Sequence, residues 1–370
     1  MKPIEALFMS YSGFRLVEVS GSPYERGFKY GSIAGDLVRL NISYYFSFWR
    51  RRFSIDEDLI LRKSEGIRNA VERFNPSLIE EMRGIADGAN VSLNQVIALN
   101  ARYELMWVML PKFSCTSAAL LSEVTVNKHV VLGQNWDYKP AVLDTNVILL
   151  VKCRDGPNIL THVEAGCLSR TGLNSEGIGL CVNALVSSQD RFEPKTPFHV
   201  LCRSILSSRS LSECIEGIVR SDRAVSYNFL IASRENVAID LEVLPKKFNY
   251  IFPDNGFIIH TNHFVKAYGF EDKFIEVIPD TIVRFERAKR ILKESIHENP
   301  VDHTALIRMF RDHFNYPNSI CRHRDPRISE DDQIETLSSI VMDLNELKML
   351  ITKSQPCINE YSQIYMENNR

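Results

Sequence analysis

The sequence predicts an α+β fold in which helices lie outside stacked β-sheets, and three observations favour it. The first third of the 370-residue chain is mostly helical in pattern. After Leu110-Pro111, short β-rich segments take over, and they are interrupted by a pair of helices before strands return. An apolar sheet face must be covered by another sheet or by helices, so this order favours stacked sheets with helices outside.

The helical leader follows one short predicted strand over residues 15–19. A long helix is expected to begin near Tyr24 and to continue through an aromatic cluster. Segments 77–80 and 92–95 both have the capping-box pattern, so each predicts the start of a further helix.

The rest of the chain is predicted from runs of β-branched and apolar residues and from helical periodicity. Strands are expected at 117–121, 129–132, 147–152, 159–163, 228–232, 237–241, 257–260, 338–342 and 347–352. Helices are expected at 199–206, 211–219, 282–295 and 303–312.

Composition excludes several classes of protein. The chain is 45% hydrophobic and 24% charged, which are globular values, and this excludes disorder and coiled coil. A formal net charge of -2 gives no strong field for nucleic acid or an anionic membrane. Eight cysteines are too few for a disulfide scaffold. Because we find no signal peptide and no apolar run that could span a bilayer, we expect a cytoplasmic protein with free thiols.

Cys115 is the best candidate for a nucleophile. It lies where the helical leader gives way to the first strand of the β-rich part, among small and hydroxylated residues. Taken alone, a single cysteine at a strand start is usually buried and inert.

An ordered series of short motifs surrounds Cys115 and changes this interpretation. In chain order the series is Gly21–Gly31, Phe113–Ala119, Gly133–Asp137, Glu164–Gly166, Gly172–Gly177, Asn183-Ala184, His260–His263 and Tyr316–Arg322. The series resembles the acyl-coenzyme A:6-aminopenicillanic acid acyltransferase family of N-terminal nucleophile hydrolases. Relatives in that family include isopenicillin N acyltransferases and insect hydrolases of β-alanyl amines. The resemblance implies a four-layer αββα sandwich of two antiparallel sheets with a helical N-terminal segment.

The resemblance also implies an inactive precursor that cuts itself between Ser114 and Cys115. Residues 1–114 would form a helix-rich pro-segment or small α subunit, and residues 115–370 would form the β subunit. The two fragments would remain packed as one structural domain. The family often has glycine before the nucleophile, and Ser114 departs from this pattern, which predicts slower cleavage because glycine tolerates a strained backbone.

Cleavage has a direct chemical purpose. The thiolate is the reactive form of cysteine, and a free thiol with a pKa near ~8.5 is only partly ionised at neutral pH. A new α-amine titrates at about 7.7–8.0 and can accept the thiol proton within one residue, whereas an amide nitrogen cannot. Cleavage therefore creates the general base and exposes the nucleophile together.

The resemblance assigns roles to further residues. Asn262 and backbone N–H groups of Glu164, Ala165 and Gly166 would stabilise the oxyanion. Asp137 would orient the new α-ammonium, and Arg322 would favour the thiolate or hold a substrate carboxylate. Asn135 and Thr116 would support these groups. The implied substrate is a small acylated amine, acylated amino acid or β-lactam, with no metal or cofactor, and with acyl-coenzyme A as a conceivable co-substrate.

Structural roles compete with each functional one. Residues 135–137 and Asn262 would also fit local turns, and Arg322 would fit a surface ion pair. For Asn174 and Gly177 we favour a hairpin turn. Three aromatic residues could line an acyl pocket, although we favour ordinary core packing for them: Tyr103, Trp107 and Phe113.

Three other functions remain as alternatives. A metal site could use His260 and His263, or the later group His313, Cys321 and His323, but neither spacing fits a zinc template. A papain-like protease would need a histidine paired with Cys115. An unprocessed relative of the family could bind an acylated ligand without reacting.

Overall fold

The strands of the protein form two sheets in the computed structural model, which describes residues 10–106, 113–266 and 269–366. The nine-stranded sheet has the order β1-β2-β5-β6-β7-β8-β9-β10-β11. Its strands are Ser10–Tyr11, Phe14–Ser20, Asn146–Lys152, Ile159–Glu164, Thr171–Asn174, Ile178–Ala184, Tyr227–Ser233, Val237–Val243 and Phe248–Ile251. The six-stranded sheet has the order β12-β3-β4-β13-β14-β15. Its strands are Phe257–His260, Ser114–Leu120, Val131–Tyr138, Glu335–Asp343, Lys348–Lys353 and Ser362–Tyr365.

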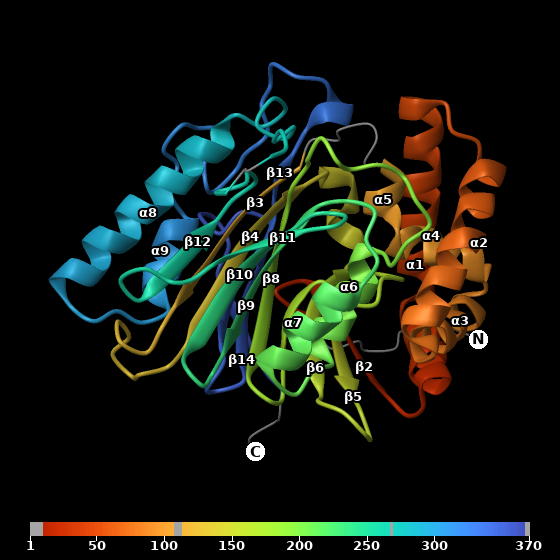
Figure 1. The fold of residues 1–370 in the computed structure, drawn as a ribbon, viewed down its shortest axis with the longest axis horizontal. Coiled ribbons are helices and arrows are strands. Elements are labelled where there is room, and N and C mark those ends of the chain that lie inside the picture. The colour runs from red at the N-terminus through yellow and green to blue at the C-terminus, as the bar shows by residue number, and fades with distance from the viewer. Residues whose placement is uncertain (1–9, 107–112, 267–268, 367–370) are drawn as a thin grey trace, which may run out of the picture.

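Helices lie outside both sheets, as Figure 1 shows with α1 to α5 on one side and α8 and α9 on the other. Helices α1 to α5 are Pro23–Phe53, Glu57–Phe74, Pro76–Ala89, Leu93–Asn100 and Arg102–Met106. Helices α6 to α9 are Phe198–Leu206, Leu211–Arg220, Asp280–Glu298 and Thr304–Phe310. No helix in the described ranges is long and apolar enough to cross a bilayer.

Three apolar layers stabilise the sandwich. Strand β3 contributes side chains to two of these layers. Ala119 packs between the two sheets with Leu132 and Ile148, whereas its neighbours Ala118 and Leu120 pack against α8 and α9. Alternate side chains of a strand point to opposite faces, which explains the division. A third layer fills the space between the nine-stranded sheet and the helices of the leader. The predicted four-layer arrangement is therefore present.

The helical leader is built into the larger sheet. Strand β2 pairs in parallel with β5, so that Val17 lies opposite Leu149. The two sheets are antiparallel as predicted except at this one pair, because a strand that enters the sheet far from its neighbour in sequence can take either direction. Residues that precede Cys115 by about a hundred positions thus contribute to the same sheet as the residues after it.

Glycines explain the close contact between α1 and α3. A Cβ atom at Gly31 would lie 2.2 Å from the carbonyl oxygen of Ile85, and one at Gly27 would lie 2.0 Å from that of Glu81. The facing Gly84 would meet the backbone of Tyr24 at 2.2 Å. The glycine motif near the N-terminus therefore serves backbone packing between two helices.

Local signals predicted most helix starts, but not all of them. Ser92 and Gln95 form the predicted capping box of α4. The predicted box at 77–80 is wrong: α3 begins at Pro76, two residues earlier than a cap at Ser77 implies, and Asn75 caps it by accepting from the backbone N–H of Ser77. Proline at the first position of a helix and asparagine before it outweigh the serine pattern here.

Candidate active site

Cys115 lies at the start of β3, inside the six-stranded sheet and next to β4. Its Cα faces that of Trp136, while the preceding Ser114 faces Asp137. The Cys115 residue is only 4% exposed. The bond between Ser114 and Cys115 is therefore placed beside a carboxylate by the register of two neighbouring strands.

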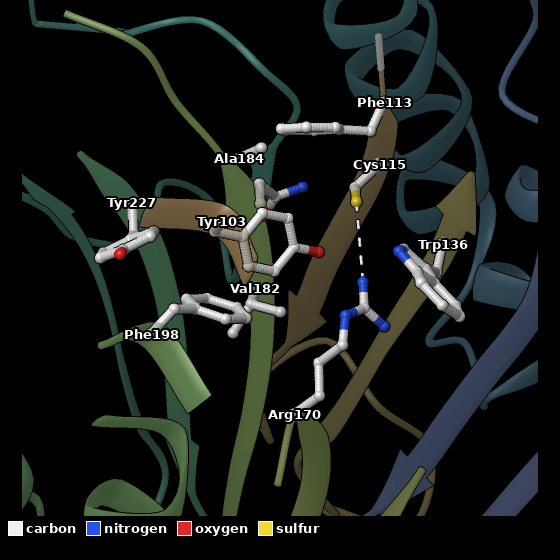
Figure 2. Close-up of a pocket in the computed structure, with 10 residues that line it drawn as sticks. Tyr103, Phe113, Cys115, Trp136, Arg170, Val182, Ala184, Phe198 and Tyr227 are labelled. Carbon is white, nitrogen blue, oxygen red and sulfur yellow. Dashed lines mark hydrogen bonds between the residues drawn. The ribbon is translucent and has the colours of Figure 1, made fainter. Parts of the chain in front are cut away.

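A narrow pocket lies against the Cys115 side chain. Figure 2 shows its aromatic residues around the sulfur and Arg170, which points towards the sulfur from below. The described residues that line it are Tyr103, Phe113, Cys115, Trp136, Arg170, Val182, Asn183, Ala184, Phe198 and Tyr227. Tyr103 and Phe113 thus belong to the pocket wall, where we had favoured core packing alone. Trp107 lies outside the described residues.

Arg170 is a buried cation beside the thiol. Its Nη2 lies 3.9 Å from Cys115 Sγ, and its guanidinium carbon lies 4.1 Å from the centre of the Trp136 ring. Its Nε and Nη1 are buried and have no acceptor among the residues that the structure describes. Burial raises the pKa of Cys115 to about 11, and the positive charge of Arg170 opposes that rise. In the uncut chain the thiol is therefore protonated at neutral pH.

The backbone around Cys115 is held by Asn262 and Arg284. The N–H of Cys115 donates to Asn262 Oδ1 at 2.7 Å, and Arg284 Nη1 donates to the Cys115 carbonyl oxygen at 2.7 Å. Arg284 Nη2 also donates to Asn262 Oδ1 at 3.1 Å. Asn262 Nδ2 donates to the carbonyl oxygen of Ala184 at 3.1 Å, which places this amide next to the pocket wall. The contacts of Asn262 are therefore long-range in sequence, unlike those of a local turn.

Asp137 and Arg322 form a buried charged group beside Ser114. Thr336 donates to Asp137 Oδ1 at 2.7 Å, and Arg322 Nε lies 3.7 Å from Asp137 Oδ2. Asp137 Oδ2 has no hydrogen-bond donor among the described residues. Burial raises the pKa of Asp137, although the neighbouring Arg322 and Arg284 oppose the rise. Arg322 also pairs with Asp280 and is buried, so the interpretation as a surface ion pair is wrong.

Comparison with known proteins places this geometry in a family. The family described as acyl-coenzyme A:6-aminopenicillanic acid acyl-transferase matches residues 124–357, which is more than half of the chain. The chain belongs to this family. The matched range begins just after Cys115. A relative from Emericella nidulans, the acyl-coenzyme A:6-aminopenicillanic-acid-acyltransferase 40 kDa form, is 29% identical over 314 residues, or 83% of this chain and 84% of the relative.

The fold of this acyltransferase-family member recurs in a solved structure. A single-residue variant of conjugated bile acid hydrolase from Clostridium perfringens superimposes with a TM-score of 0.50 at 16% identity. The match covers 69% of this chain and 94% of that chain. The predicted N-terminal nucleophile hydrolase fold is thereby confirmed.

The family member does not bring every predicted residue to the pocket. Glu164 pairs with Arg102 and accepts from Tyr45, so it belongs to the contact between β6 and the leader. The N–H of Ala165 donates to Thr145, and that of Gly166 donates to Tyr30. Both amides are already bonded in the folded chain, which argues against them as oxyanion donors. None of the three lines the pocket in the part of the chain that is described.

The remaining predicted residues support the site from a distance. Thr116 Oγ1 accepts from Arg284 at 3.1 Å. Asn135 Nδ2 donates to the carbonyl oxygens of Phe310 and Ile320, each at 2.9 Å, and so holds the segment that carries Arg322. Asn174 Oδ1 accepts from two backbone N–H groups of its own turn, which confirms the structural role that we favoured for it.

Three functional candidates were missed from the sequence. Arg170 lies two residues before the Gly172–Gly177 motif, but an arginine at such a position carries no special signal. Asn183 is part of the ordered motif series, but the sequence assigned it no function. In the structure it lines the pocket, and its buried Nδ2 has no acceptor in the described ranges. Arg284 follows Asp280 by one helical turn on α8, a spacing typical of a surface ion pair.

Neither rival centre considered from the sequence forms around the pocket. His260 Nε2 lies 3.1 Å from Glu242 Oε1, and His263 Nδ1 contacts the hydroxyl groups of Thr261 and Thr281. No histidine is found among the described residues that line the pocket of Cys115. The geometry therefore offers no Cys–His pair of the papain type within the described wall.

Proposed function

We propose that the protein is an amide hydrolase or acyltransferase that activates itself by cutting the Ser114–Cys115 bond and then reacts through Cys115. Membership of the acyltransferase family supports the general chemistry. The observation that carries the proposal is the position of Cys115: its sulfur faces a pocket and Arg170, and its amide nitrogen is held by Asn262. A structural cysteine in a core needs neither a pocket nor a nearby guanidinium.

Self-processing begins when Sγ of Cys115 attacks the carbonyl carbon of Ser114. The C–N bond breaks, the nitrogen takes a proton and becomes the α-amine of Cys115, and Ser114 is left as a thioester. Water then hydrolyses the thioester, which releases the carboxyl group of Ser114 and restores the thiol. Ser114 lies in the extended strand and is absent from the residues with positive φ, so a serine fits this backbone as well as a glycine.

The cut gives Asp137 Oδ2 a hydrogen-bond donor in addition to its ion-pair contact with Arg322 Nε at 3.7 Å. Asp137 Oδ2 has no donor among the described residues of the uncut chain, and its Cα faces that of Ser114 across the strands. The new α-ammonium of Cys115 forms within one residue of this point. A charge-assisted hydrogen bond there would orient the amine for proton transfer.

In turnover the α-amine takes the thiol proton and Sγ attacks the substrate carbonyl. The oxyanion is stabilised by the side-chain amide of Asn183 and by the second N–H of Asn262 Nδ2, whose first N–H donates to Ala184. Each such donor typically contributes about 2.7–4 kcal/mol in the transition state. The α-ammonium returns the proton to the leaving amine, which departs and leaves an acyl thioester on Cys115. Water or a second amine then takes the acyl group. Acyl-coenzyme A, itself a thioester, fits the same step as an acyl donor.

Arg170 favours substrates that carry a carboxylate. It lines the pocket, it is 1% exposed, and it takes part in no ion pair within the described residues. A buried guanidinium whose Nε and Nη1 have no acceptor among the described residues can donate a charge-assisted hydrogen bond to a substrate carboxylate. Acylated amino acids and β-lactams carry that group, whereas simple acylated amines do not.

A substrate panel tests this function. We expect release of amine from N-acyl amino acids by the processed protein and none by Cys115→Ala, with a thioester adduct on the Cys115 fragment detected by intact mass at low pH. Processed protein that turns over no amide or thioester in the panel, and forms no adduct, would contradict it.

The family often has glycine where this chain has Ser114. This difference leaves a second candidate function, in which the protein is not cut and only binds an acylated ligand. Electrophoresis separates the two, because cleavage gives fragments of ~13 and ~29 kDa by share of chain length. A single intact band together with ligand binding but no turnover supports the second candidate.

A further inference from the structure

Four potential metal ligands from three segments of the chain meet outside the active site. His313 follows α9, Cys321 and His323 lie in the loop before β13, and Cys357 lies between β14 and β15. Their ligand atoms all lie within 4.8 Å of one another. Three of these residues, His313, Cys321 and His323, are close together in the sequence. Their spacing fits no zinc template, because the fourth ligand, Cys357, is 34 residues beyond His323.

Of the six distances between the four ligand atoms, all are within 4.8 Å, and three are short enough to compare directly with a tetrahedral ion. Nε2 of His313 and Nε2 of His323 are 3.1 Å apart. Nε2 of His323 lies 3.7 Å from Sγ of Cys321 and 3.5 Å from Sγ of Cys357. Zinc bonds of about 2.0–2.1 Å to nitrogen and ~2.3 Å to sulfur, at tetrahedral angles, put two nitrogens ~3.4 Å apart and a nitrogen and a sulfur ~3.6 Å apart. The agreement is within a few tenths of an ångström for all three pairs.

We propose that His313, Cys321, His323 and Cys357 bind one Zn²⁺ ion in a structural site. Two thiolates and two imidazoles in a tetrahedron select zinc among the common divalent ions of proteins. All four positions of the ion are filled by the chain, which leaves none for a substrate and makes the site structural. His313 is exposed, and His323 and Cys357 are half-buried, so an ion has a path from solvent. The proposal revises the expectation of no metal, and it does not depend on the proposed reaction.

The chain around the ligands is already fixed by hydrogen bonds. The N–H of Cys321 donates to the carbonyl oxygen of Asp312 at 3.0 Å, and that of His323 donates to that of Pro317 at 3.1 Å. Asn135 holds the carbonyl oxygen of Ile320 from β4. Three of the ligands therefore lie on an ordered segment. Through Cys357, the ion would also link this segment to the β14–β15 connection.

The site also positions Arg322, which stands between two ligands in the sequence. Cys321 and His323 face the ion, while the Arg322 side chain extends to Asp280, Asn318 and Asp137. A metal bond on each side of Arg322 restricts the backbone that aims its guanidinium. Zinc would thus hold the Arg322 guanidinium beside Asp137. Arg322 is therefore a positioning residue.

Metal analysis of the whole purified protein tests the proposal. We expect about one zinc per chain in protein prepared without chelator under reducing conditions. Protein in which Co²⁺ replaces zinc should show thiolate-to-cobalt charge-transfer absorption. Cys357→Ser should lose that absorption, and Cys153→Ser, which removes a half-buried thiol outside the group, should keep both the absorption and the zinc.

The cysteine variant could lose the metal simply because it misfolds. His313→Gln is a second ligand variant that avoids this ambiguity, because His313 is exposed. It should fold normally and lower zinc affinity by more than ~10-fold in a chelator competition. Wild-type protein that holds less than ~0.1 zinc per chain and binds neither added Zn²⁺ nor Co²⁺ would overturn the proposal. So would a Cys321–Cys357 disulfide in the native protein, or equal zinc content in wild type and all ligand variants.

Discussion

Replacement of Arg170 by methionine is expected to raise stability and lower activity towards carboxylated substrates. Within the described ranges, Nε and Nη1 of Arg170 are buried without acceptors, and an unmade buried hydrogen bond costs about 1–3 kcal/mol. Against this stands one cation–π contact with Trp136, worth about 2 kcal/mol when desolvated, and a long contact with sulfur. Methionine keeps much of the volume, so we expect the free energy of unfolding to rise by about 1–3 kcal/mol.

The same change removes the partner of the substrate carboxylate. A hydrogen-bonded charged pair of this kind contributes about 1.5–3 kcal/mol, which corresponds to a loss of about 10- to 150-fold in kcat/KM. Arg170 also favours the thiolate, so activity on neutral substrates should fall as well, but by less. The ratio of kcat/KM for an N-acyl amino acid to that for its neutral amide isolates the carboxylate contact.

The assay is a denaturant titration combined with that selectivity ratio. Arg170→Lys serves as the matched control, because it keeps the charge and should lose only part of the ratio. A lower unfolding free energy for Arg170→Met together with an unchanged ratio would refute the argument that this cation is kept for a ligand.

Three further predictions concern the thiol, the carboxylate and the fold. Because burial raises the pKa of Cys115 to about 11, alkylation of the uncut precursor at Cys115 should speed up nearly tenfold per pH unit from pH ~7 to ~10, and a plateau near pH ~8 before cleavage would contradict this. Asp137→Asn should slow turnover of cut protein by ~10²-fold or more, measured as kcat, because the α-ammonium loses its charged partner; a change below ~3-fold would remove Asp137 from the mechanism. Gly31→Ala should destabilise the protein by about 1–3 kcal/mol in urea unfolding, because its Cβ would lie 2.2 Å from the carbonyl oxygen of Ile85, whereas Gly156→Ala, which meets nothing within 4 Å, should change little.

The sequence predicted elements best where the signal was local. The strand near residue 15, the helix from about Tyr24 and the capping box at Ser92 all depend on neighbouring residues, and all are present. The parallel pairing of β2 with β5 depends on how distant segments meet, and no local pattern reports it.

The residues of the candidate site likewise differ in whether the sequence could reveal them. The position of Cys115 could be inferred because its motif series is ordered along the chain. Arg170 and Arg284 could not, since the importance of Arg170 comes from its buried N–H groups without acceptors in the described ranges, and that of Arg284 from its bond to the Cys115 carbonyl. The turn at Glu164–Gly166 was misjudged because its amides find acceptors on the leader and on the segment before β5, which only the folded chain brings near.

The most direct measurement is the intact mass and N-terminal sequence of the purified protein beside Cys115→Ala. The account predicts that wild type yields a fragment that begins at Cys115, with a free α-amine and a free thiol, while the variant remains one chain. Wild-type protein that turns over substrate with the Ser114–Cys115 bond intact, or a Cys115→Ala variant that is still cut there, would contradict it.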